Sequence, residues 1–184
     1  MTLETKFCAP DAKSAVLSIN DGHEVSGYAS LFGQPDQGGD VVEVGAYRAS
    51  LAKIAARGGS VKMLWQHDPA QPIGVWDEVR EDARGLWVKG RILTDVTRGR
   101  EAAALLGVGA IDGLSIGYRT VRAHKDASGK RRLMELELWE ISLVTFPMLP
   151  EARVAAKGDS PDAALLREMA GAFRSVRGLM TPDG

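Results

Sequence analysis

The sequence lacks several features that mark specialised classes of protein. Its 184 residues include one cysteine, Cys8, which excludes both a disulfide framework and a cysteine-rich zinc site. No apolar run approaches the roughly 20 residues that a membrane-spanning helix needs. The first residues carry Glu4, Lys6 and Asp11 where a signal peptide would be continuously apolar. These absences predict a cytoplasmic protein that does not enter a membrane.

Basic charge is not in excess either. The 23 basic and 24 acidic side chains give 23 − 24 = −1 at neutral pH, whereas a nucleic-acid-binding protein needs a basic face. The three histidines form no H-E-x-x-H motif and no pair at ligand spacing, and no acidic calcium loop or glycine-rich phosphate loop is present. We therefore expect no nucleic-acid partner, no metal and no cofactor.

What is present is the pattern of a globular, mainly β chain. Alternating apolar residues predict strands at 27–33, 61–67, 73–79, 85–93, 111–123 and 131–146, with a weaker one at 15–20 and a break at 68–72. Helical spacing predicts helices at 46–57, 94–109 and 160–178. Because hairpins join most strands, we expect an α+β fold that is mainly β: an antiparallel six- to seven-stranded β-barrel with flanking helices. The predicted division is an N-terminal segment (1–24), the barrel (25–153), and a linker with an amphipathic helix (154–184).

Ser115 is the first residue that draws attention, because it lies within the sequence GLSIG. In α/β-hydrolases such a motif forms a sharp turn from a strand into a helix. Here the predicted order is the reverse, with a helix before the serine and a strand after it. The sequence therefore fits the α/β-hydrolase motif poorly. Glycines on both sides of the serine would still let a polypeptide approach closely. The alternative is that Gly113 and Gly117 shape a corner of the barrel and Ser115 is a small core residue.

A serine nucleophile needs a base, and His67 is the histidine best placed to serve. It lies where the apolar segment VKMLW runs into a proline-rich loop, at the rim of the sheet. The other two, His23 and His124, are expected to be solvated. The alternative for His67 is a histidine satisfied by Asp68 or by a main-chain carbonyl.

Glu140 is the third candidate. Strand alternation places it on the same face as Leu136, Leu138 and Ser142, and a carboxylate among leucines needs a partner. That partner is either an imidazole or a guanidinium, from Arg119 or Arg122. With the hairpin tip at 124–130, Glu140 is expected opposite residues 114–118 and therefore beside Ser115.

Five segments, in this order, carry a resemblance to a known family. They are GYASLF, DVVEVGAYRASL, LWQHDP with the PIG that follows it, GLSIGY, and LWEISLVTFP. In these segments, between residues 27 and 154, the chain resembles the prohead (procapsid) maturation proteases of tailed bacteriophages. Those proteins are serine peptidases with the fold of herpesvirus assemblin proteases.

The resemblance implies roles for the candidate residues. Ser115 would be the nucleophile, His67 the general base, and Glu140 the residue that orients the histidine. The oxyanion donors would be main-chain N–H groups near Met148 and Leu149.

The resemblance also implies a substrate: the scaffolding segment of the major capsid protein, a separate scaffold protein, or both. Cleavage would occur inside the procapsid of a phage or gene-transfer particle, in the host cytoplasm, with autocleavage within 154–164 and possible homo-oligomers. Two alternatives remain open. One is a non-catalytic capsid-assembly or scaffold-binding module, and the other is a small-molecule esterase that uses the GLSIG serine.

Overall fold

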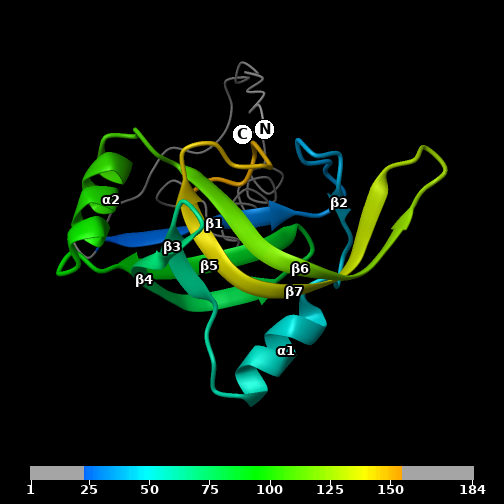
Figure 1. Ribbon diagram of the computed structural model, residues 1–184, viewed down its shortest axis with the longest axis horizontal. Helices are drawn as coiled ribbons and strands as arrows, with labels where there is room; N and C mark the ends of the chain where they lie inside the picture. Colours follow the sequence, from blue (N-terminus) through cyan, green and yellow to red (C-terminus); the bar gives the residue numbers. More distant parts are fainter. Residues whose placement is uncertain (1–22, 155–184) are drawn as a thin grey trace, which may run out of the picture.

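Seven strands form one strongly curled sheet in the computed structural model, which describes residues 23–154 (Figure 1). The strands are β1 (Glu24–Leu31), β2 (Val41–Val42), β3 (Lys62–Trp65), β4 (Asp68–Glu81), β5 (Gly85–Ile92), β6 (Gly113–Lys125) and β7 (Arg131–Val144). Within residues 23–154, two helices flank the sheet, α1 (Arg48–Ala56) and α2 (Thr97–Gly107). The prediction of a mainly β chain with flanking helices is confirmed.

The order of the strands is β1-β5-β4-β3-β7, with β6 on the other edge of β7. The two predicted hairpins, β4–β5 and β6–β7, are antiparallel as expected. The sheet as a whole is mixed, however, because β2 and β3 both run parallel to β7. These strands reach β7 through long connections, and only a tight turn forces an antiparallel pairing. The expectation of an antiparallel barrel therefore holds for the other strand pairs and is corrected at β2 and β3.

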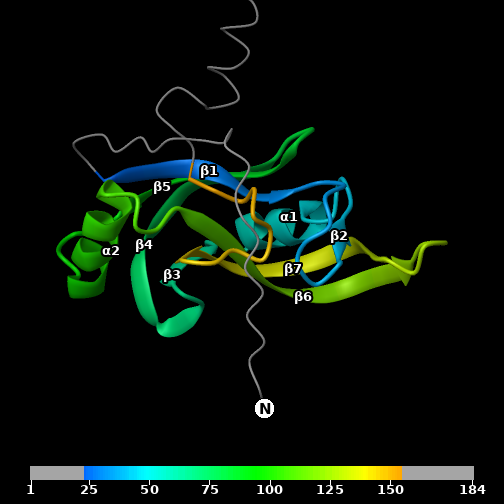
Figure 2. The ribbon, with the colours of Figure 1, turned by 90° about the horizontal axis from the view of Figure 1, so that it is seen from above.

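The curl of the sheet brings its two edge strands, β1 and β6, toward each other (Figure 2). Between them lies a short stretch of chain, where Val154 pairs with Gly27 of β1 and Arg153 pairs with Gly113 of β6. The result is a half-barrel whose remaining gap is bridged by the last described residues.

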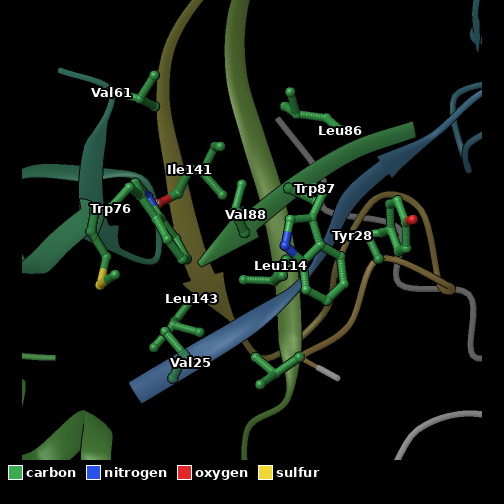
Figure 3. Packing of buried hydrophobic residues seen from close by; sticks show 14 of the residues in the cluster. Val25, Tyr28, Val61, Trp76, Leu86, Trp87, Val88, Leu114, Ile141 and Leu143 are labelled. Carbon is green, nitrogen blue, oxygen red and sulfur yellow. Dashed lines mark hydrogen bonds between the residues drawn. The ribbon is translucent and has the colours of Figure 1, made fainter. Parts of the chain in front are cut away.

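Large apolar side chains fill the inside of the curl. Tyr28 meets Trp87 edge to face, with ring centroids 5.0 Å apart, and Leu114 and Ile141 are fully buried close by (Figure 3). The indole N–H of Trp76 donates to the carbonyl oxygen of Ile141 at 3.2 Å, which satisfies both polar groups inside the core. This core holds β7 firmly from its inner face.

The apolar pattern of β7 changes phase at Trp139. Leu136 and Leu138 belong to the core, and so do Ile141 and Leu143, although 138 and 141 are an odd number of residues apart. The pairing explains this, since Gly117 faces Glu140 while Tyr118 faces Leu138, which leaves Trp139 as the extra residue of a bulge. The prediction that Glu140 shares a face with the two leucines was therefore wrong, because the bulge turns Glu140 to the opposite face.

The predicted break at 68–72 was also wrong. β4 begins at Asp68 and runs through Pro69 and Pro72, which are both exposed. The pairing of β3 with β4 is irregular next to Leu64 and Pro72, and a proline is tolerated where the ladder is already interrupted. Gln66 and His67 alone form the turn between β3 and β4.

Some predictions fall on residues that the structure does not describe. The strand at 15–20, the helix at 160–178 and the linker beyond Val154 lie outside residues 23–154. The division at 24/25 and 153/154 stays a prediction. Within the described range, neither helix combines the length and the apolar character needed to span a membrane.

Candidate active site

The pairing of β6 with β7 brings Ser115 close to Glu140. Ser115 lies directly opposite Ser142, and Gly117 lies directly opposite Glu140. Directly opposed residues of an antiparallel pair have their side chains on the same face of the sheet. Ser115, Ser142 and Glu140 therefore share one face, as the spacing of the hairpin predicts.

His67 reaches the same face from the other side of β7. β3 runs parallel to β7 with Leu64 opposite Ser142 and Trp65 opposite Leu143, and the chain then turns at Gln66 and His67. The His67 ring nitrogen Nδ1 lies 2.6 Å from Glu140 Oε1, and the His67 main-chain N–H donates to Ser142 Oγ at 3.1 Å. Two of the three predicted residues are thus in direct contact, and the third lies across one strand pair.

The alternative partners are engaged elsewhere. The Asp68 carboxylate accepts from the N–H of Ala70. Arg119 pairs with Glu137, and Arg122 lies 3.8 Å from Glu135. The alternative of a guanidinium partner for Glu140 is therefore contradicted, since both arginines pair with glutamates that lie nearer the hairpin tip.

Glu140 is 9% exposed, and both of its carboxylate oxygens are bonded. Oε1 contacts His67, and Oε2 accepts from the Ser142 hydroxyl at 2.5 Å. Gly117 provides the space, because a Cβ at that position would lie 2.0 Å from Oε1. The second glycine of GLSIG thus makes room for the carboxylate.

The hydrogen bond through Nδ1 defines what the imidazole can do. With Nδ1–H directed at Glu140, the neutral ring keeps Nε2 as its acceptor, which is the nitrogen that takes a proton in a catalytic triad. Ser115 is 6% exposed. Its hydroxyl makes no hydrogen bond to any of the described residues. Bonds between nucleophile and base are often long before substrate binds.

Met148 and Leu149 lie close to Ser115. Together with Ser115, Leu114 and Ile116 of β6 they line a hollow in the surface. Within residues 23–154 the main-chain N–H groups of Met148 and Leu149 have no hydrogen-bond acceptor, whereas the carbonyl oxygen of Met148 accepts from Gln37. The hollow also contains the Tyr118 phenol, whose pKa is raised by burial and by the nearby carboxylates of Asp40 and Asp36.

The sequence analysis did not predict that three further polar residues take part in the hydrogen bonds of the site. Ser142 bridges Glu140 and His67, while Gln66 and Thr145 bond to each other beside the histidine. A signal for Ser142 was present, since it lies two residues after Glu140 and so on the same strand face. No local pattern indicates the pairing of Gln66 with Thr145, which are 79 residues apart.

Among the residues described, no group of three or more histidine, cysteine, aspartate or glutamate side chains has the arrangement to hold a metal ion.

A hydroxyl, an imidazole and a carboxylate on one face of a curled sheet are the groups that serine hydrolases use. Comparison with protein families shows to which family of serine hydrolases the chain belongs. Residues 12–165 match the model of the Caudovirus prohead serine protease family, and the chain belongs to that family.

One curated protein and two solved structures that are similar to the chain are described next. The chain is 29% identical over 156 residues to the prohead protease of Enterobacteria phage HK97, which covers 83% of this chain and 68% of that protein. The capsid assembly protease gp21 of bacteriophage T4 superimposes with a TM-score of 0.54 at 12% identity, over 71% of this chain and 87% of gp21, which shows a shared fold. The KSHV protease in complex with a hexapeptide phosphonate inhibitor has a TM-score of 0.48 at 10% identity, over 83% of this chain and 77% of that one.

Proposed function

We propose that the chain is a serine endopeptidase that uses Ser115 as nucleophile, His67 as general base and Glu140 as the residue that orients the base. The observation that carries the proposal is the 2.6 Å contact between His67 Nδ1 and Glu140 Oε1, on the sheet face that Ser115 shares. A buried carboxylate bonded to an imidazole stabilises the imidazolium that forms when the serine loses its proton.

The reaction follows from these groups. Ser115 Oγ attacks the carbonyl carbon of the scissile peptide, and His67 Nε2 takes the hydroxyl proton. The tetrahedral intermediate collapses to an acyl-enzyme as His67 returns the proton to the leaving amine, and water then releases the acyl group by the same route. The negative oxygen of the intermediate is stabilised by main-chain N–H groups of Met148 and Leu149, which line the same hollow as Ser115.

The proposed substrates are the proteins of the assembling capsid. Membership of the prohead serine protease family supports this class of substrate. Within it we propose the scaffolding segment of the major capsid protein, a separate scaffold protein, or both, cleaved inside the procapsid in the host cytoplasm. Cleavage of the chain itself, within 154–164, belongs to the same proposal.

The test is co-expression of the chain with a candidate major capsid protein from the same genome, followed by intact-mass measurement of the capsid subunits. The active chain is expected to remove an N-terminal segment from them. Ser115→Ala and His67→Ala are each expected to lower the cleavage rate by about 10⁶-fold, and Glu140→Gln by about 10⁴-fold, because the carboxylate orients the base and transfers no proton.

Two substitutions serve as matched controls. Ser60→Ala and His124→Ala remove the same side chains at exposed positions, and both are expected to cleave at the normal rate. Subunits that are processed normally with Ser115→Ala would contradict the proposal and favour a binding module. Hydrolysis of short acyl esters that survives His67→Ala, without cleavage of capsid protein, would favour an esterase.

A further inference from the structure

The turn that carries His67 has an unusual backbone. Gln66 and His67 have φ angles of 51° and 62°, in the left-handed region that favours glycine and asparagine. Such residues persist where the surrounding structure over-determines them, and they occur often at functional sites. The contacts that hold this turn therefore also determine where the imidazole lies.

Gln66 is held by the end of β7 at three points. Its main-chain N–H donates to the carbonyl oxygen of Leu143 at 3.0 Å, which continues the β3–β7 pairing by one residue. Its side-chain Nε2 donates to Thr145 Oγ1 at 2.8 Å, and the Thr145 N–H donates to Gln66 Oε1 at 3.4 Å. Gln66 and Thr145 are both exposed, so this pair adds little to the core.

Ser142 holds the histidine itself. Its fully buried hydroxyl accepts from the His67 N–H at 3.1 Å and donates to Glu140 Oε2 at 2.5 Å. One oxygen atom therefore connects the main chain of the base with the carboxylate that orients its ring. Because the ring also bonds Glu140 through Nδ1, the three residues form a closed cycle of hydrogen bonds.

We infer that Ser142 and Thr145 are positioning residues for the peptidase reaction and that both act through His67. The Ser142 hydroxyl holds the main chain of His67. The Thr145 hydroxyl holds Gln66, the other residue of the turn. The inference rests on the proposed function. Neither hydroxyl bonds any described group outside this cluster, which comprises Gln66, His67, Glu140, Ser142 and Thr145. Their removal would release the turn while the core stays packed.

The experiment uses the full chain and a fluorophosphonate, which reacts with an activated serine and needs no known substrate. The labelling rate at Ser115 is measured by intact mass and separated into the binding constant of the probe and the rate of the chemical step. Thr145→Val removes the hydroxyl at constant shape and is expected to slow the chemical step by about 10-fold with unchanged probe binding, which is the effect of losing one hydrogen bond. Thr145→Ser keeps the hydroxyl and is expected to restore the rate.

Ser142→Ala removes two hydrogen bonds and is expected to slow the chemical step by about 100-fold. Thr120→Val, which removes a threonine hydroxyl farther along β6, is the control and is expected to label normally. A second readout is the low-field proton NMR signal of His67 Nδ1–H, which is expected to broaden or shift in Thr145→Val and Ser142→Ala and to stay unchanged in Thr120→Val.

Normal labelling and an unchanged imidazole signal in Thr145→Val would overturn the inference, even if Ser142→Ala failed to fold. Slower labelling with an unchanged imidazole signal and a lower Tm would also overturn it, because the role would then be merely structural. Failure of the proposed function gives a different result. The unsubstituted chain would then not be labelled at Ser115, while the imidazole signal would still report whether the two hydroxyls hold His67.

Discussion

At the centre of the proposed site, the Glu140 side chain occupies the space next to Gly117 where any other residue would have its Cβ. The glycine has no side chain, and the carboxylate occupies the volume where one would be, with Oε1 2.0 Å from an ideal Cβ. Glu140 cannot simply swing away, because His67 and Ser142 each bond one of its oxygens. One added methyl group must therefore displace the carboxylate from the imidazole.

We accordingly predict that Gly117→Ala lowers the rate of capsid-protein cleavage by about 10²- to 10⁴-fold, approaching the effect of losing the orienting carboxylate. The measurement is a cleavage time course with purified chain, together with thermal unfolding to verify the fold. Gly59→Ala is the matched control, since its Cβ would make ordinary contacts of 3.6 Å, and it is expected to be fully active. Full activity of Gly117→Ala would show that Glu140 does not need its observed position.

At the scale of elements, one carboxylate organises the turn between β4 and β5. Asp82 Oδ1 accepts from the N–H groups of Arg84 and Gly85 at 2.8 and 3.1 Å, and Oδ2 accepts from the Tyr28 hydroxyl at 2.7 Å. Burial acts to raise the pKa of Asp82, but the hydrogen bonds from Tyr28, Arg84 and Gly85 outweigh it and hold the pKa below its usual range. The turn is thus tied to β1 as well as to its own strands.

Asp82→Ala is therefore predicted to lower the free energy of unfolding by about 1–3 kcal/mol, through the loss of these bonds and the unpaired groups left behind. Urea denaturation at pH 7 measures it. Asp126→Ala is the comparison, because Asp126 caps the β6–β7 turn in a similar way but in an exposed hairpin tip that extends beyond the curled sheet (Figure 1). An equal loss in both variants would contradict the special role of the link to Tyr28.

The sequence was informative where structure is local. Alternating residues on either side of a turn identified the β4–β5 and β6–β7 hairpins, and the spacing from the tip placed Glu140 opposite the neighbourhood of Ser115. It failed at Trp139, since a bulge depends on how two strands fit together and leaves no mark in the alternation of one strand. It failed again at 68–72, where prolines suggested a break but lie on an irregular part of the ladder.

The site itself was predicted only in part, for the same reason. His67 and Glu140 were selected by residue type and by position near strand ends, and their contact follows from the parallel pairing of β3 with β7. That pairing joins segments about 80 residues apart, and no local pattern specifies it. Ser142, Gln66 and Thr145 acquire their roles through the same long-range contact.

At the scale of the whole molecule, titratable groups limit the pH range of stability on both sides. Hydrogen bonds hold the pKa of Asp77, bonded to Arg91, and of Glu137, bonded to Arg119, below their usual ranges, as they do for Asp82. A carboxyl with a lowered pKa in the folded state contributes stability above its unfolded pKa, near 4, and loses it as the pH falls further. Burial raises the pKa of Tyr28 and of Tyr47 in the folded state. The stability that these two neutral side chains contribute is lost as the pH rises above the tyrosine pKa of the unfolded chain, near 10.

We therefore predict a plateau of stability between about pH 5 and pH 9, with a decline on each side. Urea denaturation at a series of pH values from about 2.5 to 11 measures it. Asp82→Asn and Tyr28→Phe are the matched variants, and they are expected to weaken the acid and alkaline declines respectively. Stability that rises steadily as the pH falls below 4 would be inconsistent with the lowered carboxyl pKa values.

β7 pairs with β6 and β3, and it supplies Glu140 and Ser142 as well as the support for His67. It is also the last named strand of the described chain. During synthesis at the ribosome, a nascent chain that stops before β7 has its serine and histidine but lacks the surface that brings them together. On the proposed assignment of the site, we therefore expect no peptidase activity until nearly the whole sheet has been made.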